Sequence, residues 1–224
     1  EIEANFIPVK TKDFEWQIGG NFAKNTNTVK ELATGVDQVE IEVGFGDPGV
    51  FAKVGEPFGV LYGTTWERAA NGQLLIDDAG LPIATTELSS IGNPFPDWTA
   101  GIRTELTYKE FSLSALLDIK KGGQIWNGTQ ARINRIGRSE ASADREHTYV
   151  IEGVHADGST NTIPVEALDY WQVYKGDFGA TEESVQDAGW TRLRELTLSY
   201  TIKKVKVFKN IELSVTARNL WLKT

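Results

Sequence analysis

The chain has 224 residues, with 31 acidic and 23 basic side chains, a formal net charge of −8 and no cysteine. Without cysteine it can hold neither a disulfide scaffold, nor a thiolate zinc site, nor a cysteine nucleophile. An acidic chain with no run of Lys or Arg lacks the positive surface that nucleic-acid binding requires, so we expect no nucleic-acid partner.

Apolar and polar side chains alternate with period two, which predicts β-strands with one apolar and one polar face. Between residues 98 and 108, for example, Ile102 and Leu106 alternate with Arg103 and Glu105. The pattern predicts strands at residues 2–8, 14–24, 98–108, 111–120, 190–202 and 210–221. The predicted fold class is therefore all-β, with antiparallel strands.

Short and long connections alternate along the chain. Short turns at residues 10–13, 109–110 and 203–210 are separated by two long segments, 25–97 and 121–189. Loops longer than about 15 residues are uncommon in compact soluble domains, whereas transmembrane β-barrels combine short periplasmic turns with long extracellular loops. Alternation of side chains alone favours a soluble β-sandwich, but the loop lengths favour barrel strands with two long extracellular loops.

Aromatic residues at the strand ends are a second indication of a barrel. Trp98 and Tyr108 stand ten residues apart, and so do Trp190 and Tyr200. Ten residues of a tilted strand cover about 25 Å along the membrane normal, which is the height of a barrel's lipid-facing band. We therefore expect a membrane-interface belt made of Trp98, Tyr108, Trp190, Tyr200 and Trp221.

Two arginines conflict with this assignment. Arg192 and Arg194 alternate in step with Trp190 and Leu196, so a regular strand would place them on the lipid-facing side. A cation at the middle of the membrane costs about 2 to 4 kcal/mol. Either the strand extends beyond the bilayer at this point, or a bulge near Glu195 exchanges the two faces.

Five ordered blocks of sequence resemble SusC/RagA-like TonB-dependent outer-membrane transporters. They are VGEPFGVLYG at residues 54–63, IGNPFPDWTAG with LTYKEFSLS at 91–114, KGGQIWNGT at 121–129, VQDAGWTRLRELTLSY at 185–200 and TARNL at 216–220. The resemblance covers nearly the whole chain. It implies a bacterial outer-membrane location, import of oligosaccharides or peptides, a SusD-like surface lipoprotein as partner, energy supplied through TonB, and no cofactor.

The resemblance also implies that residues 1–224 are a segment of one larger barrel domain. We expect about six strands of a barrel of about 22, with the closing strands and the plug domain, through which TonB acts, outside this chain. The apolar faces are expected to contact outer-membrane lipid. The polar faces are expected to direct a set of side chains into the lumen, namely Arg103, Glu105, Asp118, Lys120 and Arg218.

The sequence contains no catalytic or metal-binding motif typical of an enzyme active site. His147 and His155 stand eight residues apart, which is not the spacing of a metal-binding pair. Neither a G-x-S-x-G motif nor a P-loop occurs. We expect a transport protein, and the alternative function is that of a soluble all-β carbohydrate-binding module.

Aromatic residues in the two long segments are the candidates for substrate binding, because flat apolar rings pack against sugar rings. They are Tyr62, Trp66, Trp126, Tyr170 and Trp171. The alternative is that these rings pack the segments into ordered lids.

Turn-forming residues at 71–80, Asn-Gly before an apolar run and Asp-Ala-Gly after it, predict a small β-hairpin. Three acidic residues nearby, Glu67, Asp77 and Asp78, are a weaker candidate for a calcium site, because their spacing is not that of an EF-hand loop.

Overall fold

The computed structural model describes residues 1–43, 48–205 and 207–224. The chain forms two compact units, each assembled from separate stretches of sequence. Unit 1 comprises residues 1–26, 95–123 and 187–224, and unit 2 comprises residues 27–94 and 124–186. The predicted strands thus form unit 1. We expected residues 25–97 and 121–189 to be long loops, but most of these residues together form the second folded unit.

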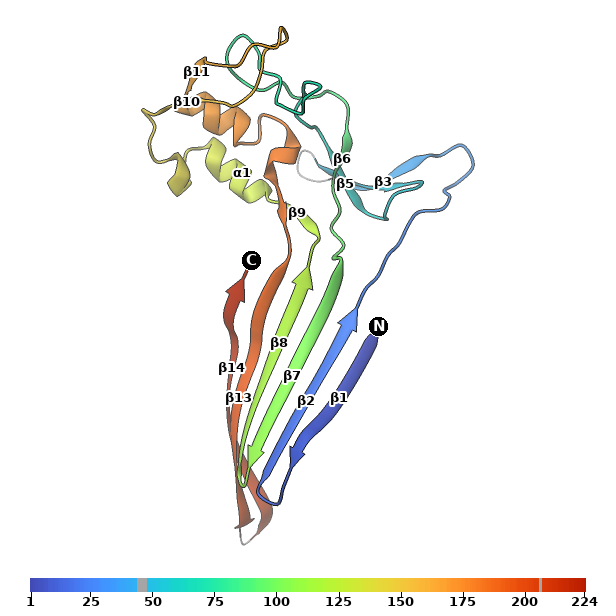
Figure 1. The fold of residues 1–224 in the computed structure, drawn as a ribbon, viewed down its shortest axis with the longest axis vertical. Helices are drawn as coiled ribbons and strands as arrows, with labels where there is room; N and C mark the ends of the chain where they lie inside the picture. Colours follow the sequence, from blue (N-terminus) through green and yellow to red (C-terminus); the bar gives the residue numbers. More distant parts are fainter. Residues whose placement is uncertain (44–47, 206) are drawn as a thin grey trace. The chain divides into compact units, whose positions relative to one another are not determined.

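Unit 1 is a single antiparallel sheet of six strands in the order β1-β2-β7-β8-β13-β14 (Figure 1). The strands are β1 (Ile2–Lys10), β2 (Phe14–Ala23), β7 (Trp98–Tyr108), β8 (Phe111–Lys121), β13 (Trp190–Val205) and β14 (Phe208–Lys223). All six predicted strands are present, and their ends differ from the prediction by a few residues. Lys206, in the last predicted turn, lies outside the described residues.

An aromatic row crosses the sheet next to the short turns. Phe14 lies opposite Tyr108, Tyr108 opposite Phe111, and Phe111 opposite Tyr200. The rings of Phe111 and Tyr200 are 4.7 Å apart between centroids. The row arises because the β7–β8 turn contains only two residues, which sets these strand ends in register, and its first residue, Lys109, adopts φ 54°.

The apolar side chains of the strands share one uncovered face of the sheet. Leu198 of β13 lies opposite Leu113 of β8 and opposite Val215 of β14. Their exposed fractions are 52%, 40% and 76%, and that of Ile102 on β7 is 42%. A β-sandwich would bury these side chains against a second sheet, so the sandwich alternative is wrong for this sheet.

β13 contains a bulge that exchanges its two faces. Arg192 lies opposite Asp118, yet Glu195 lies opposite Leu116, so three steps along β13 match two steps along β8. The extra residue shifts every side chain before it to the other side of the strand. Arg192 and Arg194 therefore share the polar face with Asp118. Of the two explanations for these arginines, the bulge near Glu195 is confirmed.

The bulge also moves Trp190 to the polar face. Trp190 lies opposite Lys120, and the guanidinium carbon of Arg192 is 4.5 Å from the centroid of its ring. The prediction that Trp190 shares the apolar face with Tyr200 is therefore wrong, because it assumed a regular strand between the two.

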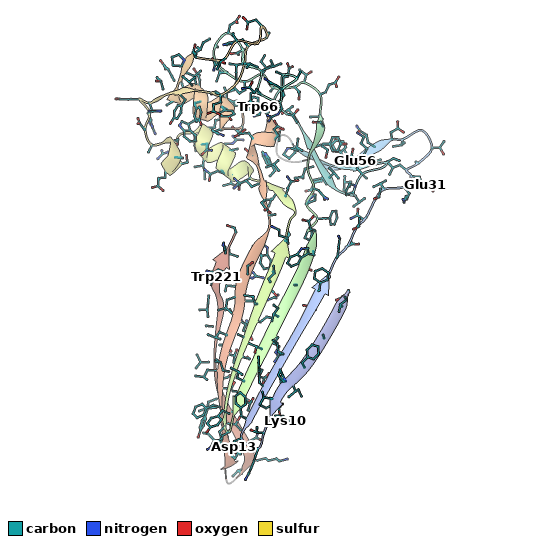
Figure 2. All side chains as sticks on the ribbon, in the orientation of Figure 1. Lys10, Asp13, Glu31, Glu56, Trp66 and Trp221 are labelled. Atoms are coloured by element: carbon teal, nitrogen blue, oxygen red, sulfur yellow. The ribbon has the colours of Figure 1, made fainter. Side chains whose placement is uncertain are left out.

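The other predicted belt residues lie on the apolar face. Trp98 follows the alternation of β7, and its ring centroid is 5.7 Å from that of Phe22. Trp221 lies opposite Leu193 on β13. Lys10 and Asp13 mark the short-turn end of the sheet, and Trp221 is near its other end (Figure 2).

Unit 2 is built around a four-stranded sheet, β3-β4-β5-β6 (Figure 1). Its strands are β3 (Gln38–Val43), β4 (Gly49–Lys53), β5 (Val60–Gly63) and β6 (Ser89–Gly92). The short pairs are β9 (Gln124–Trp126) with β12 (Val185–Asp187), and β10 (Thr148–Val150) with β11 (Pro164–Glu166). The helical elements are α1 (Gly128–Arg135), η1 (Glu140–Ser142), α2 (Ala167–Asp169), η2 (Tyr170–Tyr174) and η3 (Thr181–Ser184).

Two small apolar cores hold unit 2 together. One consists of Phe51, Val60 and Tyr62 from β4 and β5. The other consists of Ile76, Ile151 and Val165, with several tyrosines packed against it. Within the described part of the chain, no helix has the length and apolar character needed to cross a membrane.

Candidate functional site

Unit 2 contains a cavity of about 680 Å³ beside α1. One side is formed by α1 together with Trp126, and the other by residues 176–181 and Ser184. Clefts of a few hundred to about 1,000 Å³ are typical of binding sites for small molecules. The cavity is therefore the candidate site, and the elements around it determine its chemistry.

Local sequence explains why α1 begins and ends beside the cavity. The side chain of Asn127 caps the helix by accepting a hydrogen bond from the backbone of Gln130, at 3.0 Å. A side chain at Gly128 would come within 2.2 Å of the Trp126 ring, so glycine lets this ring lie against the first turn. Arg132 and Arg135 occupy the last turn, where their positive charges interact favourably with the partial negative charge of the helix C-terminus.

Two arginines of α1 meet one carboxylate at the cavity wall. Arg132 Nε lies 2.8 Å from Asp177 Oδ2, and Arg135 Nε lies 2.5 Å from Asp177 Oδ1. Arg135 Nε and Asp177 Oδ1 are buried and form no aligned hydrogen bond within the described structure, so these two atoms interact as an ion pair only. Arg135 also lies over the ring of Phe178, with 4.7 Å between the guanidinium carbon and the centroid.

The far wall of the cavity is fixed by Trp66. The indole Nε1 of Trp66 donates to Glu183 Oε2 at 3.2 Å, and its backbone N–H donates to Glu182 Oε1 at 2.9 Å. A side chain at Gly179 would come within 2.4 Å of the Trp66 ring, so only glycine fits beside it. These contacts hold η3 and the cavity-lining segment before it in one position.

Lys175 completes this network by pairing with Glu183. Burial alone would lower the pKa of Lys175, but the hydrogen bond and the negative charge of Glu183 outweigh burial and raise this pKa above its usual value of 10.5. The backbone carbonyl of Lys175 also accepts a hydrogen bond from the buried side chain of Asn134 at 2.9 Å. α1 is thereby tied to the segment that carries Asp177.

Aromatic rings from distant parts of the sequence form a cluster in unit 2. Tyr149 stacks on Tyr170 with 3.8 Å between centroids, and Tyr170 contacts Trp171 and Tyr174 at 5.1 and 5.5 Å. Tyr174 in turn lies 5.8 Å from Trp66. Burial in the cluster raises the pKa of Tyr170.

The five predicted substrate-binding aromatics have different surroundings. Tyr62 and Trp66 are each only 3% exposed, so neither can offer a ring face to a ligand, and for these two the packing alternative is correct. Tyr62 instead donates a hydrogen bond to Glu56 at 2.5 Å. Trp126 lines the cavity, and Tyr170 and Trp171 are half-buried in the aromatic cluster. For these three, substrate binding stays a prediction.

The segment predicted as a hairpin contains two successive tight turns. Arg68 bridges to Leu74 around the first, and Ile76 bridges to Pro82 around the second. The carboxylate of Asp77 accepts hydrogen bonds from two backbone N–H groups of the second turn. Across the described residues, Glu67, Asp77 and Asp78 belong to no group of three or more side chains that could hold a metal ion.

The residues predicted to face the lumen share the polar face of the unit 1 sheet. Asp118 pairs with Arg192 and Arg194 at 3.3 and 2.8 Å. Two further ion pairs of 3.3 Å join Arg103 with Glu105, and Arg218 with Glu195. Lys120 lies on the same face, opposite Thr99 and Trp190. That this face borders a lumen stays a prediction.

The residues that give the cavity its charge, Arg132, Arg135 and Asp177, were not among the predicted site residues. A signal was available in the composition. Unit 2 has 20 acidic and 8 basic residues, a net charge of −12, and four of the 8 basic residues lie between 132 and 145. Only the tertiary structure brings Asp177 to this cluster.

Comparison with known proteins gives relatives over nearly the whole chain. No family model matches. The chain is 25% identical, over 251 aligned residues, to the TonB-dependent receptor P3 of Formosa agariphila, and the match covers 98% of this chain and 23% of the receptor. The chain thus spans about a quarter of the length of its relatives. The resemblance to TonB-dependent transporters that the motifs indicated is confirmed.

Solved structures establish the fold of the corresponding segment. The RagAB peptide transporter matches with a TM-score of 0.67 and 17% identity, covering 99% of this chain and 25% of that chain. The closed-closed state of the RagAB peptide importer matches with a TM-score of 0.65 and 16% identity, again over 99% of this chain and 25% of that chain. The prediction of antiparallel barrel strands of the SusC/RagA type is confirmed.

Proposed function

We propose that the chain is part of the wall and of the extracellular region of a TonB-dependent nutrient importer in the bacterial outer membrane. It is a transport protein of the SusC/RagA kind and not an enzyme. The six-stranded sheet of unit 1 is the wall segment, and unit 2 lies outside the cell. The closing strands and the plug domain belong to parts of the protein beyond this chain.

The observation that carries the proposal is the uncovered apolar face of unit 1. Side chains such as Ile102 and Leu198 are about half exposed, although every strand is paired in a regular sheet. A soluble protein rarely leaves so continuous an apolar face open to water, whereas a barrel turns such a face to the acyl chains. The aromatic row of Phe14, Tyr108 and Phe111 at the short-turn end fits the girdle at the periplasmic interface.

The polar face of the same sheet supports a lumen on its other side. Asp118, Arg192 and Arg194 form a charged group there. Charged side chains are tolerated in a barrel wall when they face water or the plug domain. We assign this face to the lumen.

The partners and cargo follow from the relatives. We propose a SusD-like surface lipoprotein that closes the extracellular side, and TonB acting through the plug domain. The cargo is an oligosaccharide or a peptide, and the solved relatives, which are described as peptide importers, support peptides.

The lipid-facing assignment can be tested with tryptophan fluorescence in the full-length transporter. Reconstituted into vesicles with brominated acyl chains, the transporter should lose a lipid-quenched component of its emission when Trp98 is replaced by Phe. Trp190→Phe is the matched control, because Trp190 lies on the opposite face. Equal loss of the quenched component in both variants, or in neither, would contradict the proposal.

The transport assignment needs a separate measurement in cells. Uptake of the nutrient by the full-length transporter should stop when TonB is deleted. Uptake that continues without TonB would exclude a TonB-dependent importer.

A further inference from the structure

We propose that the cavity beside α1 binds a carboxylate group of the cargo, which Arg132 and Arg135 hold while Trp126 packs against the adjoining apolar part. The inference rests on the proposed function, because it narrows the chemical class of the nutrient. A peptide supplies such a group at its C-terminus, and an acidic oligosaccharide supplies it on a uronic acid ring.

The distribution of charge is the first argument. Unit 2 has a net charge of −12, and such a surface repels anions. Within it, α1 places Arg132 and Arg135 three residues apart in its last turn, at the wall of one cavity. Asp177 neutralises only one of the two charges, so these three residues leave a local charge of +1 where the unit as a whole is acidic.

The geometry of the guanidinium groups is the second argument. Both arginines meet Asp177 through Nε. Among the described residues, the terminal nitrogens of Arg132 and Arg135 donate no hydrogen bond to another side chain or to the backbone. A guanidinium group presents its N–H donors in a planar fork that matches the two oxygens of a carboxylate. Asp177 therefore positions the two groups and leaves the terminal donors for a ligand.

The size and the apolar lining of the cavity are the third argument. The cavity of about 680 Å³ can hold several residues of a peptide or sugar units of an oligosaccharide, far more than a single carboxylate. The rings of Trp126 and Phe178 line it beside the two arginines. An apolar chain or the flat face of a sugar ring can pack against Trp126 while its charged end meets the arginines.

The wall is rigid enough to keep this arrangement before a ligand arrives. Asn134 ties α1 to the carbonyl of Lys175, two residues before Asp177. Trp66 fixes the segment on the other side of Asp177 through Glu182 and Glu183. Preorganised donors lose little conformational freedom on binding, which favours affinity.

The test compares charged and neutral forms of two probes on the purified full-length transporter in detergent, by isothermal titration calorimetry. One probe is an N-acetylated hexapeptide with neutral side chains, as the free acid and as the C-terminal amide. The other is trigalacturonate and its methyl ester. A peptide source predicts that the free acid binds more tightly than the amide, and an oligosaccharide source predicts that trigalacturonate binds more tightly than its ester.

The variants are Arg132→Gln and Arg135→Gln, with Arg138→Gln as the matched control. Arg138 follows α1 closely and carries the same charge, but it does not line the cavity. Each cavity variant should weaken binding of the preferred acid probe about tenfold or more, which is the effect of losing a charge-assisted hydrogen bond. Binding of the neutral form should change less than about twofold in every variant, and Arg138→Gln should leave both forms unchanged.

In the binding experiment, three outcomes would overturn the inference: equal binding of acid and neutral forms for both probes, no binding of either acid, or an equal loss in Arg138→Gln and in the cavity variants. The near-ultraviolet circular dichroism of each variant shows whether its fold is intact, and Arg135→Lys, which keeps the charge without the fork, should recover part of the affinity. TonB-dependent uptake measured on the same variants separates the two proposals. Uptake that depends on TonB but not on Arg132 or Arg135 would remove this inference and leave the proposed function standing.

Discussion

Arg194 on β13 places Nη1 2.8 Å from Oδ2 of Asp118 on β8, and the contact exists because β13 bulges between Leu193 and Glu195. Without the bulge, the register that holds at Leu196 would set Arg194 and Arg192 on the apolar face. The bulge instead gathers both cations around one carboxylate on the polar face. Bulges commonly redirect side chains at the rims of barrels in this way.

We predict that Asp118→Asn destabilises the folded transporter by about 1 to 2 kcal/mol. This value lies between the small effect of an exposed ion pair and the large effect of a buried one, because Asp118 is mostly buried while Arg194 is more than half exposed. Urea unfolding of the full-length protein in vesicles measures it. Glu110→Gln is the control, since its pair with Lys203 is exposed and should contribute under about 0.5 kcal/mol. Equal losses in the two variants would mean that the ion pairs of Asp118, which the bulge brings together, contribute no more stability than an exposed ion pair.

We predict that Leu198→Arg lowers the free energy of unfolding in vesicles by about 2 to 4 kcal/mol, the cost of a cation in the middle of the lipid-facing band. Leu198 lies at the centre of the apolar face, between Leu113 and Val215. Ser199→Arg introduces the same side chain one residue further, on the polar face opposite Ser112 and Ser214, and should cost much less. A larger loss for Ser199→Arg would mean that the two faces have been exchanged.

We predict that Trp66 and Trp126 have separable roles. Trp66→Phe removes the donor to Glu183 from a buried position and should destabilise unit 2 by about 1 to 3 kcal/mol, while it should weaken the binding of an acid probe less than Trp126→Ala does, because Trp66 holds the cavity wall without lining the cavity. Trp126→Ala should do the reverse, because Trp126 lines the cavity. Denaturant unfolding and calorimetry measure the two effects. Loss of affinity in Trp66→Phe with intact stability would contradict the assignment.

We predict that unit 2 loses stability as the pH rises above about 10.5. The folded state raises the pKa of Lys175 from 10.5, so its pair with Glu183 contributes stability below the unfolded pKa and loses it as the pH passes the folded pKa. Burial likewise raises the pKa of Tyr170 and Tyr62, which adds to the loss in the same pH range. Denaturant unfolding between pH 9 and 11.5, followed by tryptophan fluorescence, measures the change.

Lys175→Met tests the contribution of lysine to that change. The variant should be less stable than the parent at pH 9 and show a weaker loss towards pH 11.5, because the contribution of Lys175 is gone while those of Tyr170 and Tyr62 remain. An unchanged pH dependence in Lys175→Met would show that the pair with Glu183 does not contribute.

Local sequence determined the strands of unit 1. Successive side chains of a strand point to opposite faces, so apolar residues such as Ile102 and Leu106 recur at every second position. This period of two can be read from the sequence without knowing which strands pair with one another. The two-residue turn at Lys109 and Glu110 sets the register of β7 and β8 in the same way. These features are confirmed, and with the motifs they were sufficient to indicate the family resemblance.

Only the tertiary structure showed the contacts between residues that are far apart in the sequence. The position of the bulge depends on how β13 pairs with β8 and β14 together, so the face of Trp190 could not be read from its spacing to Tyr200. The cavity depends on α1 meeting residues 176–181, which are more than forty positions away from its start. Contacts between distant segments arise from the packing of the whole unit, and the period of a single strand or helix carries no information about them.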